Sequence, residues 1–171
     1  VGHGQLDRAA LGKLLGDAGV TAVVDVRRFP GSRTNPDARR EALEEWLPAL
    51  DIDYRWEERL GGRRHLRKAE LAASADTWWR VSQFRAYATH TREREFHDAM
   101  SQLLALARSH ATAVMCSESV WWRCHRRLIA DVAVLAHGWT VHHLMPDGRL
   151  AEHVPAEGAR LRDDGEVVWD G

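Results

Sequence analysis

The chain has 171 residues, of which 44% are hydrophobic and 29% are charged, and its formal net charge at pH 7 is −1. This length and composition are typical of one globular domain and exclude wholesale disorder. The balanced charge gives no general signal for a nucleic acid or membrane partner. The chain has no apolar run of about 18 residues, no signal-peptide pattern and only two Cys residues. We therefore expect a cytoplasmic protein without a membrane span or a disulfide scaffold.

Strands and helices are expected to alternate along the chain. Short apolar segments rich in β-branched residues predict buried strands, and apolar residues three or four positions apart predict helices. In chain order, the expected strands are residues 1–3 (the end of a strand), 20–26, 52–56, 112–116 and 139–144. The expected helices are residues 6–18, 38–50, 93–109 and 124–137.

This alternation predicts an α/β fold. We expect a single three-layer domain with a mostly parallel sheet of about five strands and a Rossmann-like layout. Residues 57–92 interrupt the alternation and are expected to form a helical insertion. The α/β domain should cover residues 1–145. Residues 146–171 should form an acidic, polar C-terminal tail that packs on the domain or extends from it, with room for a short hairpin.

Polar and reactive residues follow the expected strands. In open parallel sheets, ligands bind beyond the carboxyl ends of the strands, so we expect these residues to meet in one pocket. The residues concerned are His3, Arg27, Ser32, Arg33, Cys116, Glu118, Arg123, Cys124, His125 and Arg126.

Within this pocket, cations should bind an anion while other groups supply the chemistry. Guanidinium groups hold phosphate and carboxylate oxygens in pairs. The expected anion-binding residues are Arg27, Arg33, Arg126, Ser32 and Arg123. The expected catalytic residues are Glu118, as acid, base or nucleophile, with Cys116, His125 and His3 assisting. Two structural interpretations stay open: Glu118 pairs with an Arg, and Cys116 is a small core residue.

Six separated motifs resemble the domain of unknown function 488 family. They are Gly2-His3, DVRRFPGSR at 25–33, LGG at 60–62, FRAYA at 84–88, CSE at 116–118 and RCHR at 123–126. The resemblance covers residues 1 to about 145, and Gly4 stands where the family often has Ser. It implies a single α/β domain in which the motifs gather at one pocket.

The two Cys residues suggest three other kinds of site. A cysteine phosphatase needs five residues between Cys and Arg, whereas six separate Cys116 from Arg123. A rhodanese-like loop of backbone donors needs glycine, which residues 117–121 lack. For zinc, the seven residues between Cys116 and Cys124 exceed the usual spacing, and adjacent helical side chains such as Cys124 and His125 point about 100° apart. We therefore expect no metal and no cofactor.

Three functions remain open. The first is an enzyme, a hydrolase or a transferase, that acts on an anionic substrate bearing a phosphate or a nucleotide. The second is a non-catalytic nucleotide or nucleic-acid binding module, since basic runs at 27–40 and 59–68 occur with Trp residues that can stack on bases. The third is a thiol-based redox protein that uses Cys116 and Cys124. The expected partner is a small anionic or nucleotide-like ligand, with no membrane partner and no indication of the oligomeric state.

Overall fold

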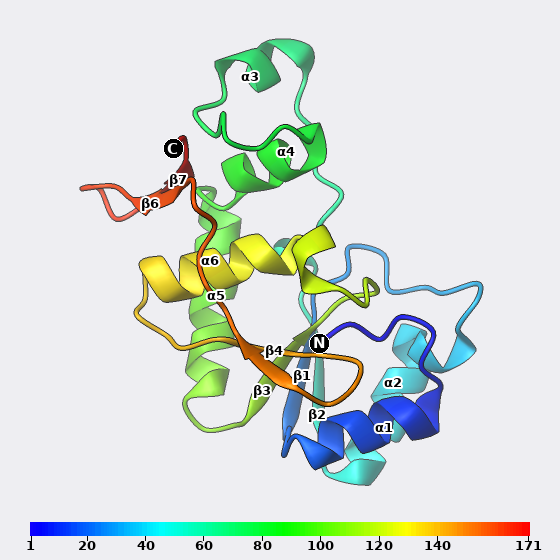
Figure 1. The fold of residues 1–171 in the computed structure, drawn as a ribbon. Helices are drawn as coiled ribbons and strands as arrows, with labels where there is room; N and C mark the ends of the chain where they lie inside the picture. Colours follow the sequence, from blue (N-terminus) through cyan, green and yellow to red (C-terminus); the bar gives the residue numbers. More distant parts are fainter.

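The computed structural model describes all 171 residues (Figure 1). The helices are α1 (Arg8–Asp17), α2 (Arg40–Trp46), α3 (Lys68–Ala73), α4 (Ser82–His90), α5 (Arg94–Ala107) and α6 (Arg126–Leu135). The strands are β1 (Ala22–Asp25), β2 (Asp53–Trp56), β3 (Thr112–Met115), β4 (His142–Leu144), β5 (Leu150–Glu152), β6 (Ala159–Leu161) and β7 (Val167–Trp169). Short 3-10 turns lie at Pro36–Ala38 (η1), Pro48–Leu50 (η2), Glu58–Leu60 (η3) and Trp121–Arg123 (η4).

A three-stranded parallel sheet forms the centre of the fold. The strand order is β2-β1-β3, and Asp25 at the end of β1 pairs with Trp56 on one side and Met115 on the other. Beyond β3, Gly2 makes a single parallel bridge to Cys116. The carboxyl ends of the strands and the first residues of the chain therefore meet at one edge of the molecule.

Helices cover both faces of this sheet (Figure 1). On one face, Val23 packs with Leu15 of α1 and Leu43 of α2. On the other face, Val24 packs with Phe96 of α5 and Leu128 of α6. All four residues of β1 are buried, as the central strand of a parallel sheet requires. The predicted mixed α/β fold is thus confirmed.

The parallel sheet is smaller than expected, with three strands instead of about five. The segment expected at 139–144 forms β4, which pairs antiparallel with β5. The first residues of the chain contribute only the bridge at Gly2, so they do not form a full strand. The edge of β3 away from β1 pairs with no further strand, and Thr112, Ala113 and Val114 of β3 line a cavity. The Rossmann-like layout is not confirmed.

All four expected helices are shorter in the structure, and two of the differences have a local cause or a consequence for the site. The segment 38–50 divides into α2 and η2 because Pro48 has no N–H for the helical ladder. The helix expected from residue 124 begins at Arg126, and Cys124 has extended backbone angles of φ −128° and ψ 149°. The second difference changes where the Cys124 side chain lies. No helix combines the length and the apolar composition that crossing a membrane requires.

The last 26 residues contribute to the main core. Strands β6 and β7 form a hairpin, and Val167 and Trp169 lie in the hydrophobic cluster that packs against the sheet. The Trp169 indole N–H donates to the buried carboxylate of Asp131 in α6, over 2.8 Å. His153 also bonds to this carboxylate, over 2.8 Å. Asp131 therefore ties this C-terminal segment to α6.

Candidate functional site

A polar pocket of about 570 Å³ opens where β1 and β3 end. It is formed by the segments that follow these strands, by the turn after η3 and by α4. Its lining residues are His3, Arg27, Arg28, Phe29, Gly31, Ser32, Gly62, Arg63, His65, Val81, Gln83, Phe84, Tyr87, Cys116, Ser117, Glu118, Arg123, Cys124 and His125. Most of the residues expected at the carboxyl ends of the strands therefore lie around one pocket.

Cys116, Cys124 and His125 form a compact group at the buried side of the pocket, which we call the thiol–imidazole cluster. The Nδ1 atom of His125 lies 3.6 Å from Cys124 Sγ and 4.0 Å from Cys116 Sγ. All three atoms lie within 4.8 Å of one another. Cys116 directly follows β3, and Cys124 and His125 connect η4 to α6. Both Cys side chains are free and buried.

Neighbouring backbone fixes the His125 ring. Its Nε2 atom lies 3.1 Å from the carbonyl oxygen of Val26, at the end of β1. A carbonyl only accepts, so Nε2 carries the proton and Nδ1 presents its lone pair to the sulfur atoms. A Cβ atom on Gly62 would come within 2.7 Å of Nδ1, so the ring position requires glycine there.

The two thiols are electrostatically different. A hydrogen bond from Cys116, and then the charge of Arg126, lower the pKa of Cys124 to about 6 despite burial. The same shared hydrogen bond, together with burial, raises the pKa of Cys116 to about 12. Arg126 also donates from Nε to Cys124 Sγ over 3.3 Å. The surroundings therefore favour the thiolate at Cys124 and the protonated thiol at Cys116.

Arg27 lines the pocket, but its guanidinium is occupied by protein groups. Nε donates to both carboxylate oxygens of Asp25 at 2.8 and 3.1 Å, and Nη1 donates to the Ala38 carbonyl over 2.8 Å. Tyr54 also donates to Asp25, over 2.7 Å. Arg27 and Asp25 are both buried, so they form a satisfied internal ion pair.

His3 lies beside this pair. Its Nε2 atom is 3.2 Å from Arg27 Nη1, and its Nδ1 atom is 3.0 Å from the Gly4 carbonyl. Burial, and then the charge of Arg27, lower its pKa. His3 is therefore neutral at physiological pH.

The structure separates Arg33 and Arg126 from the other expected anion-binding residues. Arg33 is exposed and does not line the pocket. Arg126 is buried behind the thiol–imidazole cluster, where it contacts Cys124 and donates from Nη2 to the Glu118 carbonyl. Ser32 lines the pocket, and its Oγ atom accepts from the Asn35 amide over 3.0 Å.

Three other arginines have free guanidinium groups at the pocket. Arg28 follows the ion-paired Arg27, Arg63 follows the Gly61-Gly62 turn, and Arg123 ends η4. No side-chain hydrogen bond or ion pair engages any of them. Only Arg123 was expected from the sequence. Arg28 lies in the DVRRFPGSR motif and Arg63 directly follows the LGG motif, so their position after a strand or a glycine turn was the available signal.

Glu118 is the only acid among the residues that line the pocket. Its side chain is exposed, and its backbone carbonyl is held by Arg126. Tyr87, which lies in the FRAYA motif but is not among the expected site residues, donates to the Leu60 carbonyl over 2.6 Å. The Tyr87 ring also lies 5.0 Å from the His125 ring, so it closes one side of the cluster.

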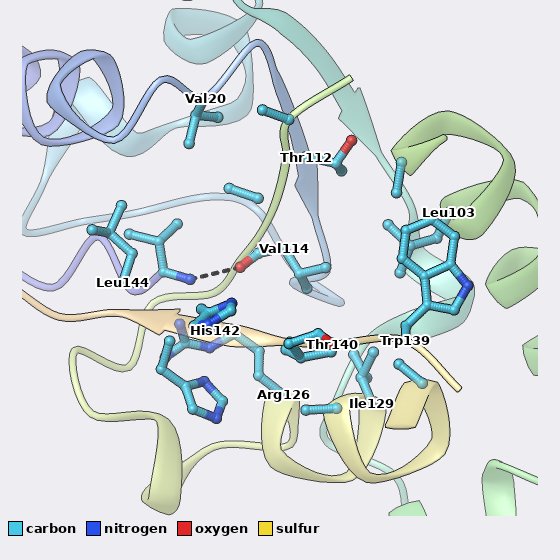
Figure 2. Close-up of a pocket in the computed structure, with 18 of the residues that line it drawn as sticks. Val20, Leu103, Thr112, Val114, Arg126, Ile129, Trp139, Thr140, His142 and Leu144 are labelled. Atoms are coloured by element: carbon cyan, nitrogen blue, oxygen red, sulfur yellow. Dashed lines mark hydrogen bonds between the residues drawn. The ribbon is translucent and has the colours of Figure 1, made fainter. Parts of the chain in front are cut away.

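A second cavity, of about 330 Å³, lies between β3, β4 and α6 (Figure 2). Its walls are mostly hydrophobic and include Leu103, Val114, Ile129 and Trp139. The amino group of Val1 donates to the Val114 carbonyl over 2.9 Å, and Val114 is labelled in Figure 2. This cavity offers apolar contact and has none of the free cations found in the polar pocket, so we place the candidate site in the polar pocket.

A family model described as "Domain of unknown function DUF488" matches residues 6–133 of the chain. The matched range includes β1, β3, the three free arginines and the thiol–imidazole cluster. No curated protein and no solved structure matches the chain.

Proposed function

Since the chain belongs to the DUF488 family, we propose from its site that it is an enzyme acting on an anionic substrate, one that bears a phosphate or a nucleotide. The substrate would lie in the polar pocket, with Arg28, Arg63 and Arg123 around its anionic group. The reaction would be a hydrolysis or a group transfer. A cytoplasmic location belongs to the same proposal.

The observation that carries this proposal is three unpaired guanidinium groups around one pocket. Elsewhere in the molecule many arginines pair with a neighbouring acid, as Arg59 does with Glu57 and Arg160 with Asp170. Arg28, Arg63 and Arg123 have no such partner and approach the pocket from three separate segments. Guanidinium groups bind phosphate oxygens in pairs, and a volume of about 570 Å³ is typical of a small-molecule site.

The other expected anion-binding residues support the pocket instead. Arg27 is tied to Asp25, so it fixes the loop that presents Arg28. Arg126 holds the Glu118 carbonyl and so places the carboxylate of that residue at the pocket. As the only acid there, Glu118 is the proposed acid or base. Cys116, His125 and His3 complete the proposed reactive side.

Steady-state assays with a panel of phosphate monoesters and nucleotides test this function. Arg28→Gln, Arg63→Gln and Arg123→Gln each remove one charged donor, which should lower kcat/KM about 10- to 150-fold. Arg33→Gln is the matched control, because Arg33 is exposed outside the pocket. No turnover of any panel member, or equal losses in Arg33→Gln and the other variants, contradicts the proposal.

A non-catalytic nucleotide or nucleic-acid binding module would use the same three arginines. It would bind a panel member or an oligonucleotide with the same dependence on Arg28, Arg63 and Arg123, but it would not turn the ligand over. Binding measured beside turnover in the same samples separates these two functions.

A thiol-based redox function is the second candidate, because the Cys116 and Cys124 sulfur atoms lie within 4.8 Å of each other. Oxidation would join them in a disulfide, with two electrons passed to a disulfide or peroxide oxidant, which is reduced, and with release of the protons that the two sulfur atoms still hold. Intact mass after diamide treatment measures the loss of two hydrogens per chain. Retention of both free thiols after this treatment contradicts this second function.

A further inference from the structure

We propose that the thiol–imidazole cluster binds one divalent metal ion, with zinc as the best match, through Cys116 Sγ, Cys124 Sγ and His125 Nδ1. The fourth coordination position would face the polar pocket. The inference deepens the proposed function, because it adds a Lewis acid beside the proposed anion site. It can nevertheless be tested in the resting protein without any substrate.

The distances fit tetrahedral coordination. Zinc lies about 2.3 Å from a thiolate sulfur and about 2.0 Å from an imidazole nitrogen, so a tetrahedron places these ligand atoms about 3.6 Å apart. In the structure, His125 Nδ1 lies 3.6 Å from one sulfur and 4.0 Å from the other. The two sulfur atoms lie within 4.8 Å of each other, so small side-chain shifts would bring all three ligand atoms to the corners of a coordination shell.

The imidazole is prepared to act as a ligand. Metal-bound histidines usually donate their other ring N–H to a carbonyl or a carboxylate, which fixes the tautomer and the ring orientation. His125 has this arrangement, because Nε2 donates to the Val26 carbonyl over 3.1 Å while Nδ1 faces the sulfur atoms. A ring with the opposite tautomer would direct an N–H at the metal position.

The charges around the cluster also suit an ion. A divalent cation that displaces the thiol proton of Cys116 would form a neutral group with the two buried thiolates. Arg126 Nε donates to Cys124 Sγ over 3.3 Å, which is the kind of outer contact that orients a thiolate ligand. Soft sulfur and imidazole ligands favour zinc over magnesium or calcium.

On one helix, the adjacent Cys124 and His125 side chains would point about 100° apart and could not easily share an ion. In the structure, Cys124 has extended backbone angles and α6 begins only at Arg126. The two side chains therefore converge on the same side. Cys116 comes from the end of β3, so the long spacing between the two Cys residues is closed by the fold.

Three protein ligands and an open position are typical of catalytic zinc sites, whereas structural sites use four. All three cluster residues line the polar pocket, so the open position would face the space that Arg28 and Arg123 also border. An ion there would polarise an oxygen of the anion that these arginines hold.

Metal analysis and cobalt spectroscopy test the site. The protein is purified without chelator and its metal content is measured by mass spectrometry. Chelated wild-type protein is then titrated with Co²⁺. We expect one ion per chain and a near-ultraviolet thiolate-to-cobalt absorption typical of two thiolates. A folded wild type that binds no stoichiometric Zn²⁺ or Co²⁺, or that binds Co²⁺ without this absorption, overturns the inference.

Variants locate the ligands. Cys124→Ser and His125→Ala should weaken Co²⁺ binding by more than about 100-fold, which exceeds the usual effect of losing an outer contact. His65→Ala is the matched control, since His65 lines the same pocket outside the cluster. Unchanged affinity in the cluster variants overturns the site. If a cluster variant fails to fold, the wild-type cobalt spectrum still decides.

The two proposals fail separately. Metal bound by the cluster, together with phosphate esters that are neither bound nor turned over, would remove the proposed function but keep the metal site. Turnover of a phosphate ester by a protein that binds no metal would keep the proposed function and remove the metal site.

Discussion

His125 points one ring nitrogen at the Val26 carbonyl and the other at Cys124, over distances of 3.1 and 3.6 Å. This relationship links the end of β1 to the start of α6. The chemistry of the thiol–imidazole cluster therefore depends on the position of the His125 ring. That position depends in turn on Gly62, which packs against the ring.

Gly62→Ala should therefore disturb the cluster. The added Cβ would lie 2.7 Å from Nδ1, 3.1 Å from Cγ and 3.2 Å from Cε1 of the His125 ring, so the ring must move. We expect a loss of about 1–3 kcal/mol in the free energy of unfolding and weaker Co²⁺ binding. Urea denaturation and cobalt titration measure the two effects.

Gly31→Ala is the matched control, because Gly31 lines the same pocket and a Cβ there meets nothing within 4 Å. Its free energy of unfolding should change by less than about 0.5 kcal/mol. Equal behaviour of the two variants would show that Gly62 does not position His125.

Arg27→Met should act on stability. It would leave the buried Asp25 carboxylate without its partner, which typically costs about 3–5 kcal/mol. Arg160→Met is the control, since Arg160 pairs with Asp170 at the surface, where solvent screens the pair, and this variant should keep nearly the full free energy of unfolding. Urea denaturation measures both. If Arg27→Met keeps full stability yet loses phosphate binding, Arg27 is an anion ligand and the account of the ion pair is wrong.

Stability should fall in acid because of His143. This buried ring bonds to His153, which bonds to Asp131, and it stacks on Trp121. Burial, and then the charge of His153, lower its pKa to about 3. The unfolded state, with an ordinary pKa near 6.5, binds the proton first. The contribution of neutral His143 to stability should therefore be fully present above pH 6.5. Below that pH, the free energy of unfolding should fall by about 1.4 kcal/mol per pH unit, towards pH 3.

Urea denaturation between pH 7 and pH 4 measures this slope. The amino terminus, Arg126 and His142 also face the ring and contribute to the shift. His143→Gln should lower this slope by the amount that corresponds to the uptake of about one proton on unfolding. His142→Gln, at an exposed position, should leave the slope unchanged. The same slope in His143→Gln and wild type would remove His143 as the cause.

Glu118→Gln should separate binding from chemistry. The amide keeps the size of the side chain but cannot exchange a proton as a carboxylate does. Affinity for a substrate found in the phosphate-ester panel should persist, while kcat should fall about 10²- to 10⁴-fold. Calorimetry and steady-state kinetics on the same sample measure the two quantities. Normal kcat in Glu118→Gln would exclude it as acid or base.

Local sequence patterns predicted those elements that depend on local residues. The apolar segment around β1 and the helical spacing of α1 and α5 placed these elements within two residues of their observed ends. The pairing partner of β4 could not be predicted, because a short strand does not encode which edge it joins. Antiparallel pairing with β5 follows from the turn between them.

In the site, too, a general rule predicted part of the arrangement and contacts between distant residues determined the rest. The clustering of motif residues followed from one rule about the ends of parallel strands. Which arginine is free could not be predicted, because it depends on the neighbours in space: Asp25 neutralises Arg27, while Arg28 has no partner. The convergence of Cys124 and His125 depends on one extended residue before α6, which the helical pattern of the sequence conceals.

The most direct test of the central claim is a calorimetric titration with pyrophosphate. The triple variant Arg28→Gln/Arg63→Gln/Arg123→Gln is compared with wild type and with Arg33→Gln, at fixed ionic strength. We predict binding to wild type and to Arg33→Gln with similar affinity, and no measurable binding to a folded triple variant. Equal binding to all three proteins, or binding lost only in Arg33→Gln, would contradict the assignment of the polar pocket as an anion site.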